Sequence, residues 1–216
     1  MSTKTWEVRW EGDLPGTPEQ IWDAFTRHTA AYLWPVTYEP RVGGAEQGLN
    51  SEGGTVTAWE PQRHFRTEAR GEHNILDYTL DGTRLSYVHH GEAPADEFDV
   101  QYDACVQHTN LYNHSLGEYV GHFAGREPHY LAFDDVPGST EDVLARLGIP
   151  ADAAAGDEVE LGVVDYRVGS MVGVRAGSAL IRVYGRDAWG WPVGVSIHSF
   201  DGPADEQTWR KRLEVA

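Results

Sequence analysis

The chain has 216 residues, of which 40% are hydrophobic and 24% charged, with 24 glycines and 11 prolines. This composition is typical of globular proteins and excludes disordered and collagen-like chains. Its 17 Lys and Arg against 34 Asp and Glu give a net charge of −17. Because such a charge repels phosphate backbones and anionic lipid surfaces, we expect neither nucleic acid nor a membrane as a partner.

Targeting and cofactor signals are also missing from the sequence. No apolar run approaches the roughly 20 residues of a membrane span. The start, MSTKTWE, lacks the basic and then apolar pattern of a signal peptide, so the expected location is the cytoplasm. No phosphate-loop, dinucleotide-binding, zincin or nucleophile-elbow motif occurs, and the single cysteine, Cys105, has no Cys-x-x-Cys neighbour. No cofactor is therefore predicted, and Cys105 is interpreted as an inert buried thiol.

The first predicted elements are a strand and a short helix. Residues 6–11 alternate apolar and polar side chains, which indicates a half-buried strand. Thr17 is a candidate N-cap, Pro18 suits the first helical position, and Gln20 can complete a capping box. The buried stripe of this helix is predicted to contain Ile21, Trp22 and Phe25.

Short alternating segments follow, separated by turn residues, and predict a meander of antiparallel strands. An Asp81-Gly82 turn joins the last two of these strands as a hairpin. The predicted strands are 36–42, 55–59, 64–70, 74–80 and 84–90.

From about residue 99 to residue 123 the apolar period becomes helical, which predicts the longest helix of the chain. Gly125 and Pro128 then end it. Its buried stripe is predicted to consist of Cys105, Thr109, Tyr112, Leu116, Tyr119 and Phe123. His114, Glu118 and His122 form another row at helical spacing, which we interpret as a solvated face; no metal site is predicted.

The second half of the chain repeats landmarks of the first. Residues 13–22 (DLPGTPEQIW) are echoed by residues 135–144 (DVPGSTEDVL), and the PADE sequence at 94–97 recurs at 203–206. Two interpretations stay open, an ancient duplication and a chance recurrence of common turn and cap motifs. Strands are predicted at 163–167, 171–175, 179–184 and 193–200.

Several segments of the first half together resemble the SRPBCC (START-like) superfamily, in its branch related to the activator of the heat-shock-protein ATPase. These segments are 18–25 (PEQIWDAF), 38–44 (YEPRVGG), 54–61 (GTVTAWEP) and 82–90 (GTRLSYVHH). The resemblance covers roughly residues 5 to 125 and implies an α+β helix-grip fold, in which an antiparallel sheet wraps a long helix. Its members include lipid and polyketide binders and aromatase/cyclases.

The resemblance leaves the remaining residues unexplained, since members of this branch are mostly single domains. We therefore expect a helix-grip domain over residues 1–129 and a smaller α+β lobe over residues 130–216, a candidate shortened repeat of the same fold. The chain lacks the separate N-terminal domain of the eukaryotic co-chaperone, so chaperone activation is not expected.

His89 is the most informative histidine. It shares strand parity with Leu85 and Tyr87, so it is expected to point inward, toward the long helix. There it can donate to a ligand carbonyl or act as an acid or base, with Tyr112 as a hydrogen-bond donor; a purely structural role is the alternative. His198 occupies the equivalent place in the second half.

Three functions remain open on this evidence. The first is binding of a small apolar or aromatic molecule, and the second is a cyclase or dehydratase that uses His89 and Tyr112. The third is an interaction protein that uses exposed Trp189 and Trp191. A homodimer is left open. The predicted ligand-binding residues are Trp10, Trp22, Trp34, Tyr38, Tyr78, Tyr87, His89, His108, Tyr112 and Tyr119.

Overall fold

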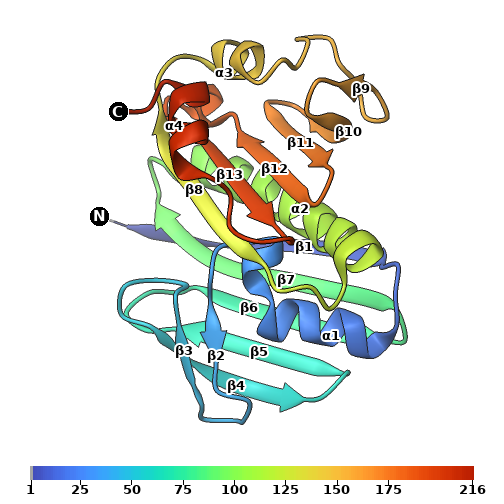
Figure 1. Cartoon of the computed structure of the whole chain (residues 1–216). Helices are drawn as coiled ribbons and strands as arrows, with labels where there is room; N and C mark the ends of the chain where they lie inside the picture. The colour runs from blue at the N-terminus through green and yellow to red at the C-terminus, as the bar shows by residue number, and fades with distance from the viewer. Residues whose placement is uncertain (1) are drawn as a thin grey trace. The chain divides into compact units, whose positions relative to one another are not determined.

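The computed structural model describes residues 2–216 and divides into two compact units, Met1–Gly125 and Arg126–Ala216 (Figure 1). Each unit is described by itself. Among the residues described, no helix is long and apolar enough to cross a membrane.

The first unit contains seven strands, two α-helices and one short 3₁₀ helix. In chain order its elements are β1 (Thr3–Asp13), α1 (Pro18–Arg27), η1 (Thr29–Ala31), β2 (Thr37–Tyr38), β3 (Ala45–Gln47), β4 (Gly54–Glu60), β5 (His64–Ala69), β6 (Ile75–Asp81), β7 (Arg84–Pro94) and α2 (Phe98–Phe123).

The seven strands form one antiparallel sheet in the order β1-β7-β6-β5-β4-β3-β2. The first strand pairs with the last along its whole length, from Thr3 opposite Pro94 to Asp13 opposite Arg84. Helix α2 packs against β1, β7 and α1. Figure 1 shows this long helix beside β1 and β7. The unit is therefore an α+β helix-grip fold, as the sequence predicted.

Helix α1 begins where the capping signal predicted. The Thr17 hydroxyl accepts a hydrogen bond from the Gln20 amide at 3.2 Å, and the Gln20 side chain accepts one from the Thr17 amide at 2.9 Å. This reciprocal pair satisfies two amides that a helix start otherwise leaves without partners. The preceding Gly16 has a φ of +146°, a conformation that L side chains rarely adopt.

Two sequence predictions for the first unit are wrong in their details. The strand expected over residues 36–42 is only two residues long, because the chain turns at Pro40 and β3 follows after Gly43 and Gly44. The burial of α2 is also wider than one stripe, since Leu111, Asn113 and Ser115 are buried as well. Ser115 and Asn113 return their side-chain hydrogen bonds to carbonyls one turn earlier, which is how these polar residues are accommodated.

The second unit contains a six-stranded antiparallel sheet in the order β8-β13-β12-β11-β10-β9. Its elements are β8 (His129–Val136), α3 (Thr140–Arg146), β9 (Glu158–Val159), β10 (Gly162–Val168), β11 (Met171–Ala176), β12 (Ala179–Tyr184), η2 (Arg186–Trp189), β13 (Val193–Ser199) and α4 (Glu206–Leu213).

The second unit repeats the connectivity of the first. In both units a strand and a capped helix lead into a meander, and the first strand pairs with the last strand before the final helix. Ser139 forms a capping box with Asp142 at the start of α3, as Thr17 does with Gln20. Residues of α3, α4 and one face of the sheet form a single apolar core. The shared topology agrees with a duplication, which itself stays a prediction.

The loop with two tryptophans differs from its predicted exposed hairpin. Arg186–Trp189 form the short 3₁₀ helix η2. Trp189 and Trp191 are both half-buried, and their ring centroids lie 5.7 Å apart. Each indole therefore covers part of the other, and the two rings do not form the fully exposed pair that the glycine-rich sequence predicted.

Candidate functional site

A row of aromatic side chains crosses the inner face of the first sheet. Strand register sets Trp10 opposite Tyr87, Tyr87 opposite Tyr78, and Tyr78 opposite Phe65. Trp59 on β4 continues the row opposite Phe65. Because side chains alternate between the two faces of a strand, residues that stand directly opposite one another share a face.

The rings of this row pack closely with those of neighbouring elements. Phe25 of α1 stacks on Tyr78 with centroids 4.9 Å apart, and Tyr38 meets Phe65 edge-on at 4.6 Å. Tyr78 and Tyr87 lie 4.8 Å apart. The result is a dense aromatic layer in which Phe25, Phe65 and Tyr78 are buried.

Four tyrosine hydroxyls gather within this layer, those of Tyr32, Tyr38, Tyr78 and Tyr87. Burial raises the pKa of Tyr78 to about 12 and places the pKa of Tyr32, Tyr38 and Tyr87 well above the ordinary value. All four therefore stay protonated near neutral pH and are able to donate hydrogen bonds.

One of these hydroxyls lacks a hydrogen-bond partner. The buried oxygen of Tyr38 has none among the residues described, whereas the Tyr32 hydroxyl interacts with that of Tyr78. A buried polar group without a partner costs about 1–3 kcal/mol. The inner face therefore carries unused hydrogen-bonding capacity inside an otherwise apolar layer.

His89 lies at the edge of this layer, where the sequence predicted it to point inward. Its Nε2 is 3.0 Å from Asn74 Oδ1, and its Nδ1 is 3.1 Å from Cys105 Sγ. Burial lowers the pKa of His89 to about 4, with a smaller contribution from the neighbouring His90 and an opposing one from Glu72. His89 is therefore neutral at pH 7.

This contact gives Cys105 a partner that the sequence did not predict, while its interpretation as an inert thiol stays a prediction. The sequence offered no histidine at a fixed local spacing from the thiol, yet the fold brings one to hydrogen-bonding distance. The reason is tertiary, because α2 crosses β7 and the two residues belong to different elements. The thiol is half-buried, and burial raises its pKa.

The other predicted ligand residues are dispersed around the unit. Tyr112 touches both Trp34 and His108, with ring centroids 5.9 and 5.8 Å away. These three rings form a second aromatic group on α2 and the loop before β2. His108 also hydrogen-bonds through Nδ1 to the Ala104 carbonyl at 2.8 Å, and Trp34 donates to Gly48.

Trp22 and Tyr119 belong to the packed interior. Trp22 meets Trp59 edge-on at 5.2 Å and Phe25 at 5.3 Å. Tyr119 is buried, and its ring lies 6.1 Å from that of His28. Their predicted ligand-binding roles stay predictions.

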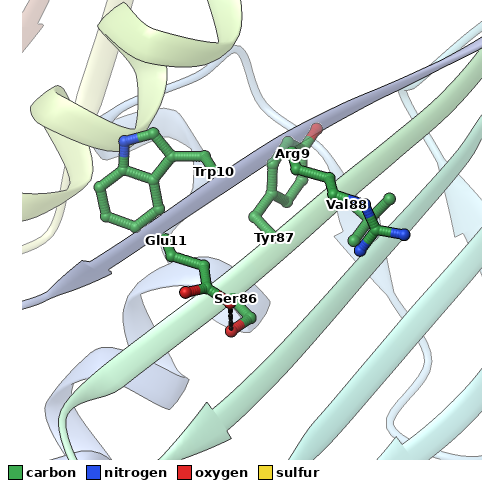
Figure 2. A pocket seen from close by; sticks show the side chains of 6 residues that line it. All are labelled: Arg9, Trp10, Glu11, Ser86, Tyr87 and Val88. Carbon is green, nitrogen blue, oxygen red and sulfur yellow. Dashed lines mark hydrogen bonds between the residues drawn. The ribbon is translucent and has the colours of Figure 1, made fainter.

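Trp10 borders two surface pockets of the first unit. One, of about 240 Å³, lies at the β1–β7 pair, and Figure 2 shows Glu11 hydrogen-bonded to Ser86 there. The second, of about 370 Å³, lies between the end of β1 and α2. The first is lined by Arg9, Trp10, Glu11, Ser86, Tyr87 and Val88. The second is lined by Trp10, Asp13, Leu14, Pro15, Asn113, His114, Gly117, Glu118, Gly121 and His122.

The histidine row of α2 is less solvated than predicted. His122 is exposed and pairs with Glu118 at 3.7 Å, but the Glu118 side chain is only 18% exposed. His114 is half-buried. The sequence correctly predicted a helix in which these three residues recur at helical spacing. It did not predict how far this face is buried, because that depends on tertiary packing.

Sequence reasoning missed Tyr32 and Asn74. Tyr32 follows η1 in a loop without periodicity, and Asn74 precedes β6 in a turn. A loop residue carries no face assignment, so no local signal placed Tyr32 beside the aromatic row. Asn74 did carry a signal, because the strand predicted over 74–80 gives it the same face as Leu76 and Tyr78.

The second unit carries a buried polar network on the face of its sheet opposite to its apolar core. Tyr184 Oη lies 3.0 Å from Ser196 Oγ, which lies 2.9 Å from His198 Nε2. Arg182 forms a two-pronged ion pair with Asp165 at 2.8 and 3.0 Å. His198 is fully buried, and its role stays a prediction.

No family model and no curated protein matches the sequence. Solved structures resemble the chain over about half of its length. They include the protein of unknown function SA2116 from Staphylococcus aureus, with 14% identity and a TM-score of 0.44 over 55% of this chain and 95% of that one. The Aha1 dimer from Colwellia psychrerythraea has 15% identity and a TM-score of 0.44 over 56% and 99%. CalU16 from Micromonospora echinospora has 14% identity and a TM-score of 0.39 over 56% and 86%.

Proposed function

We propose that the first unit binds a small aromatic molecule with carbonyl or ester oxygens on the inner face of its sheet. The observation that carries this proposal is the buried hydroxyl of Tyr38, which has no partner among the described residues. A ligand oxygen satisfies such a donor, and the aromatic rings around it suit an aromatic ligand.

The charge of the chain favours a neutral ligand over an anionic one. The net charge of −17 repels anions over long range, and the four clustered tyrosines are uncharged near neutral pH. Neutral ketones and esters offer acceptor oxygens for these phenols. Because such ligands carry no charge, no charged group has to lose its hydration when they bind.

The two alternative functions have less support. Both ring nitrogens of His89 have partners in Asn74 and Cys105, so while the thiol is unmodified His89 has no free nitrogen for the substrate of a cyclase or dehydratase. Trp189 and Trp191 are half-buried and contact each other, which argues against an exposed docking patch.

Native mass spectrometry of the purified protein tests for a retained molecule. A thermal-shift comparison of benzophenone with diphenylmethane then tests the role of the acceptor, since the two compounds differ mainly in one carbonyl. We expect benzophenone to raise the melting temperature with concentration and diphenylmethane to raise it less. An empty protein that responds to neither compound would contradict the proposal.

The cytoplasmic location and the homodimer belong to the same proposal. The acidic composition supports the location, and sedimentation of the full chain over a range of concentrations tests for the dimer.

A further inference from the structure

Cys105, His89 and Asn74 form a linear arrangement of side chains from three different elements. Cys105 lies in the second turn of α2, His89 on β7, and Asn74 in the turn before β6. The sulfur is 3.1 Å from Nδ1 of the imidazole, and Nε2 on the other side of the ring is 3.0 Å from Asn74 Oδ1. A thiol, an imidazole and an amide in this order form the constellation of a cysteine nucleophile with its base and an orienting group.

The direction of each hydrogen bond follows from the groups that flank Asn74. Its Nδ2 donates to Glu72 at 3.3 Å, so its Oδ1 faces His89. An amide oxygen only accepts, which assigns the imidazole proton to Nε2 and leaves the Nδ1 lone pair facing the thiol. The Cys105 S–H therefore donates to Nδ1, the orientation that proton transfer from sulfur requires.

The groups that face this pair set its charge state. Burial lowers the pKa of His89, His90 lowers it further, and Glu72 opposes the shift. Burial also raises the pKa of the Cys105 thiol, while Thr109 opposes this shift through its side-chain hydrogen bond. The Tyr87 ring lies 6.5 Å from that of His89 and remains a neutral phenol. At rest the pair is therefore a neutral thiol and a neutral imidazole.

The thiol also borders the cluster of tyrosine hydroxyls. Cys105 lies close enough to Tyr87 to influence that phenol, which in turn neighbours Tyr78 and Tyr38. The buried Tyr38 hydroxyl, which has no partner among the described residues, belongs to the same cluster. A carbonyl oxygen held by these hydroxyls brings its carbon toward the sulfur. This last step rests on the proposed function, whereas the thiol–imidazole geometry does not.

We propose that Cys105 is a nucleophile for activated acyl compounds, aryl esters and thioesters, with His89 as its base and Asn74 as the positioning residue of that base. In the acylation step a bond forms between Sγ and the acyl carbon while the S–H proton moves to His89 Nδ1. The alcohol or thiol then leaves with that proton, and a thioester remains on Cys105. Water, deprotonated by the same imidazole, hydrolyses the thioester, releases the acid and restores the thiol.

Alkylation of the full chain by iodoacetamide tests the pair without any assumption about the ligand. Cys105 is the single cysteine of the chain, so intact-mass analysis assigns every thioether adduct to it. Because His89 accepts the proton, we expect a rate nearly independent of pH between about pH 5 and 7. In His89→Gln the reaction depends on free thiolate alone, so its rate should rise about tenfold per pH unit. At about pH 6 this rate should be at least tenfold lower than the rate of the wild type.

Two further variants keep the alkylation test decisive. His90→Gln removes the adjacent histidine, which pairs with Glu7 instead of the thiol, and should retain the flat profile. Asn74→Ala leaves the imidazole in place without its orienting partner and should reduce the rate at about pH 6 by severalfold. Circular dichroism and melting temperature identify any variant that fails to fold. If the wild-type rate rises steeply with pH and His89→Gln leaves it unchanged, the proposal is wrong.

Acylation is measured with p-nitrophenyl acetate. In the wild type we expect a rapid release of one equivalent of p-nitrophenolate and the attachment of one acetyl group to the protein. Cys105→Ala should show neither the rapid release nor the acetyl group. His89→Gln should slow the rapid release at least tenfold. Identical release by the wild type and Cys105→Ala would overturn the assignment. If benzophenone does not bind but the alkylation rate is independent of pH, the proposed ligand site is wrong and the nucleophile assignment stands. If benzophenone binds but the alkylation rate rises steeply with pH, the ligand site stands and the nucleophile assignment is wrong.

Discussion

Arg182 and Asp165 meet across strand β11, and Gly173 is the residue that lets them do so. Both side chains are buried, at 0% and 3% exposure, although they stand on β12 and β10. A Cβ at Gly173 would lie 2.6 Å from Arg182 Nη1 and 2.7 Å from Asp165 Oδ1. A glycine on the intervening strand therefore provides the space for an ion pair between strands that are not adjacent.

Removal of one partner of this ion pair should destabilise the protein severely. Arg182→Met leaves a buried carboxylate without its guanidinium, and we expect a loss of about 3–5 kcal/mol in the free energy of unfolding. Urea denaturation measures this loss. Arg182→Met combined with Asp165→Leu should recover most of the stability, and a double variant as unstable as Arg182→Met would contradict the explanation.

The unpaired hydroxyl of Tyr38 should lower the stability of the empty protein and strengthen ligand binding. Tyr38→Phe removes this unsatisfied buried hydroxyl, so the empty protein should gain about 1 kcal/mol in the free energy of unfolding. The same change should weaken benzophenone binding about fivefold, since one donor is lost. Tyr102→Phe, at a side chain that is 39% exposed, is the control and should change neither quantity. A Tyr38→Phe protein that is less stable and binds equally well would argue against an unfilled donor.

The pH dependence of stability should contain a contribution from His89. The pKa of this residue falls from 6.5 in a free side chain to about 4 in the folded protein. Between these values the unfolded chain binds the proton more readily, so stability should fall as the pH drops from about 6.5 to 4, by about 3 kcal/mol in total.

Urea denaturation at several pH values in this interval measures the effect of His89. His89→Gln should show a shallower fall than the wild type, whereas His90→Gln should stay much closer to the wild type, because His90 supplies the smaller part of the His89 pKa shift. Equal slopes in the wild type and His89→Gln would mean that His89 is protonated equally in the folded and unfolded states.

The capping box of α1 should be worth about 1 kcal/mol. Thr17→Ala removes the hydroxyl that accepts from the Gln20 amide, and thermal or urea unfolding measures the resulting loss. Thr17→Ser retains an acceptor and is expected to stay within a few tenths of a kcal/mol of the wild type. Equal losses in both variants would place the effect in the lost methyl group instead.

The local rules predicted most elements of this chain because their causes lie within a few residues of sequence. Alternation identified the strands from β4 to β7 and from β10 to β13, and cap residues identified the start of α1. Strand β7 nevertheless continues to Pro94, beyond the predicted end at residue 90, because pairing with β1 extends to Thr3. Partner strands, which a local pattern does not contain, therefore decided where elements end.

The sequence by itself determined the α+β class, the order of elements in both halves, the inward direction of His89 and the acidic, single-cysteine character of the chain. Those properties depend on composition and on periods of two and 3.6 residues, which are local. Only the tertiary structure decided that Cys105 meets His89, that Asn74 orients that imidazole, and that Tyr32 joins the aromatic layer. Each of these contacts joins different elements, so it is set by the register of the sheet and the path of α2 across it.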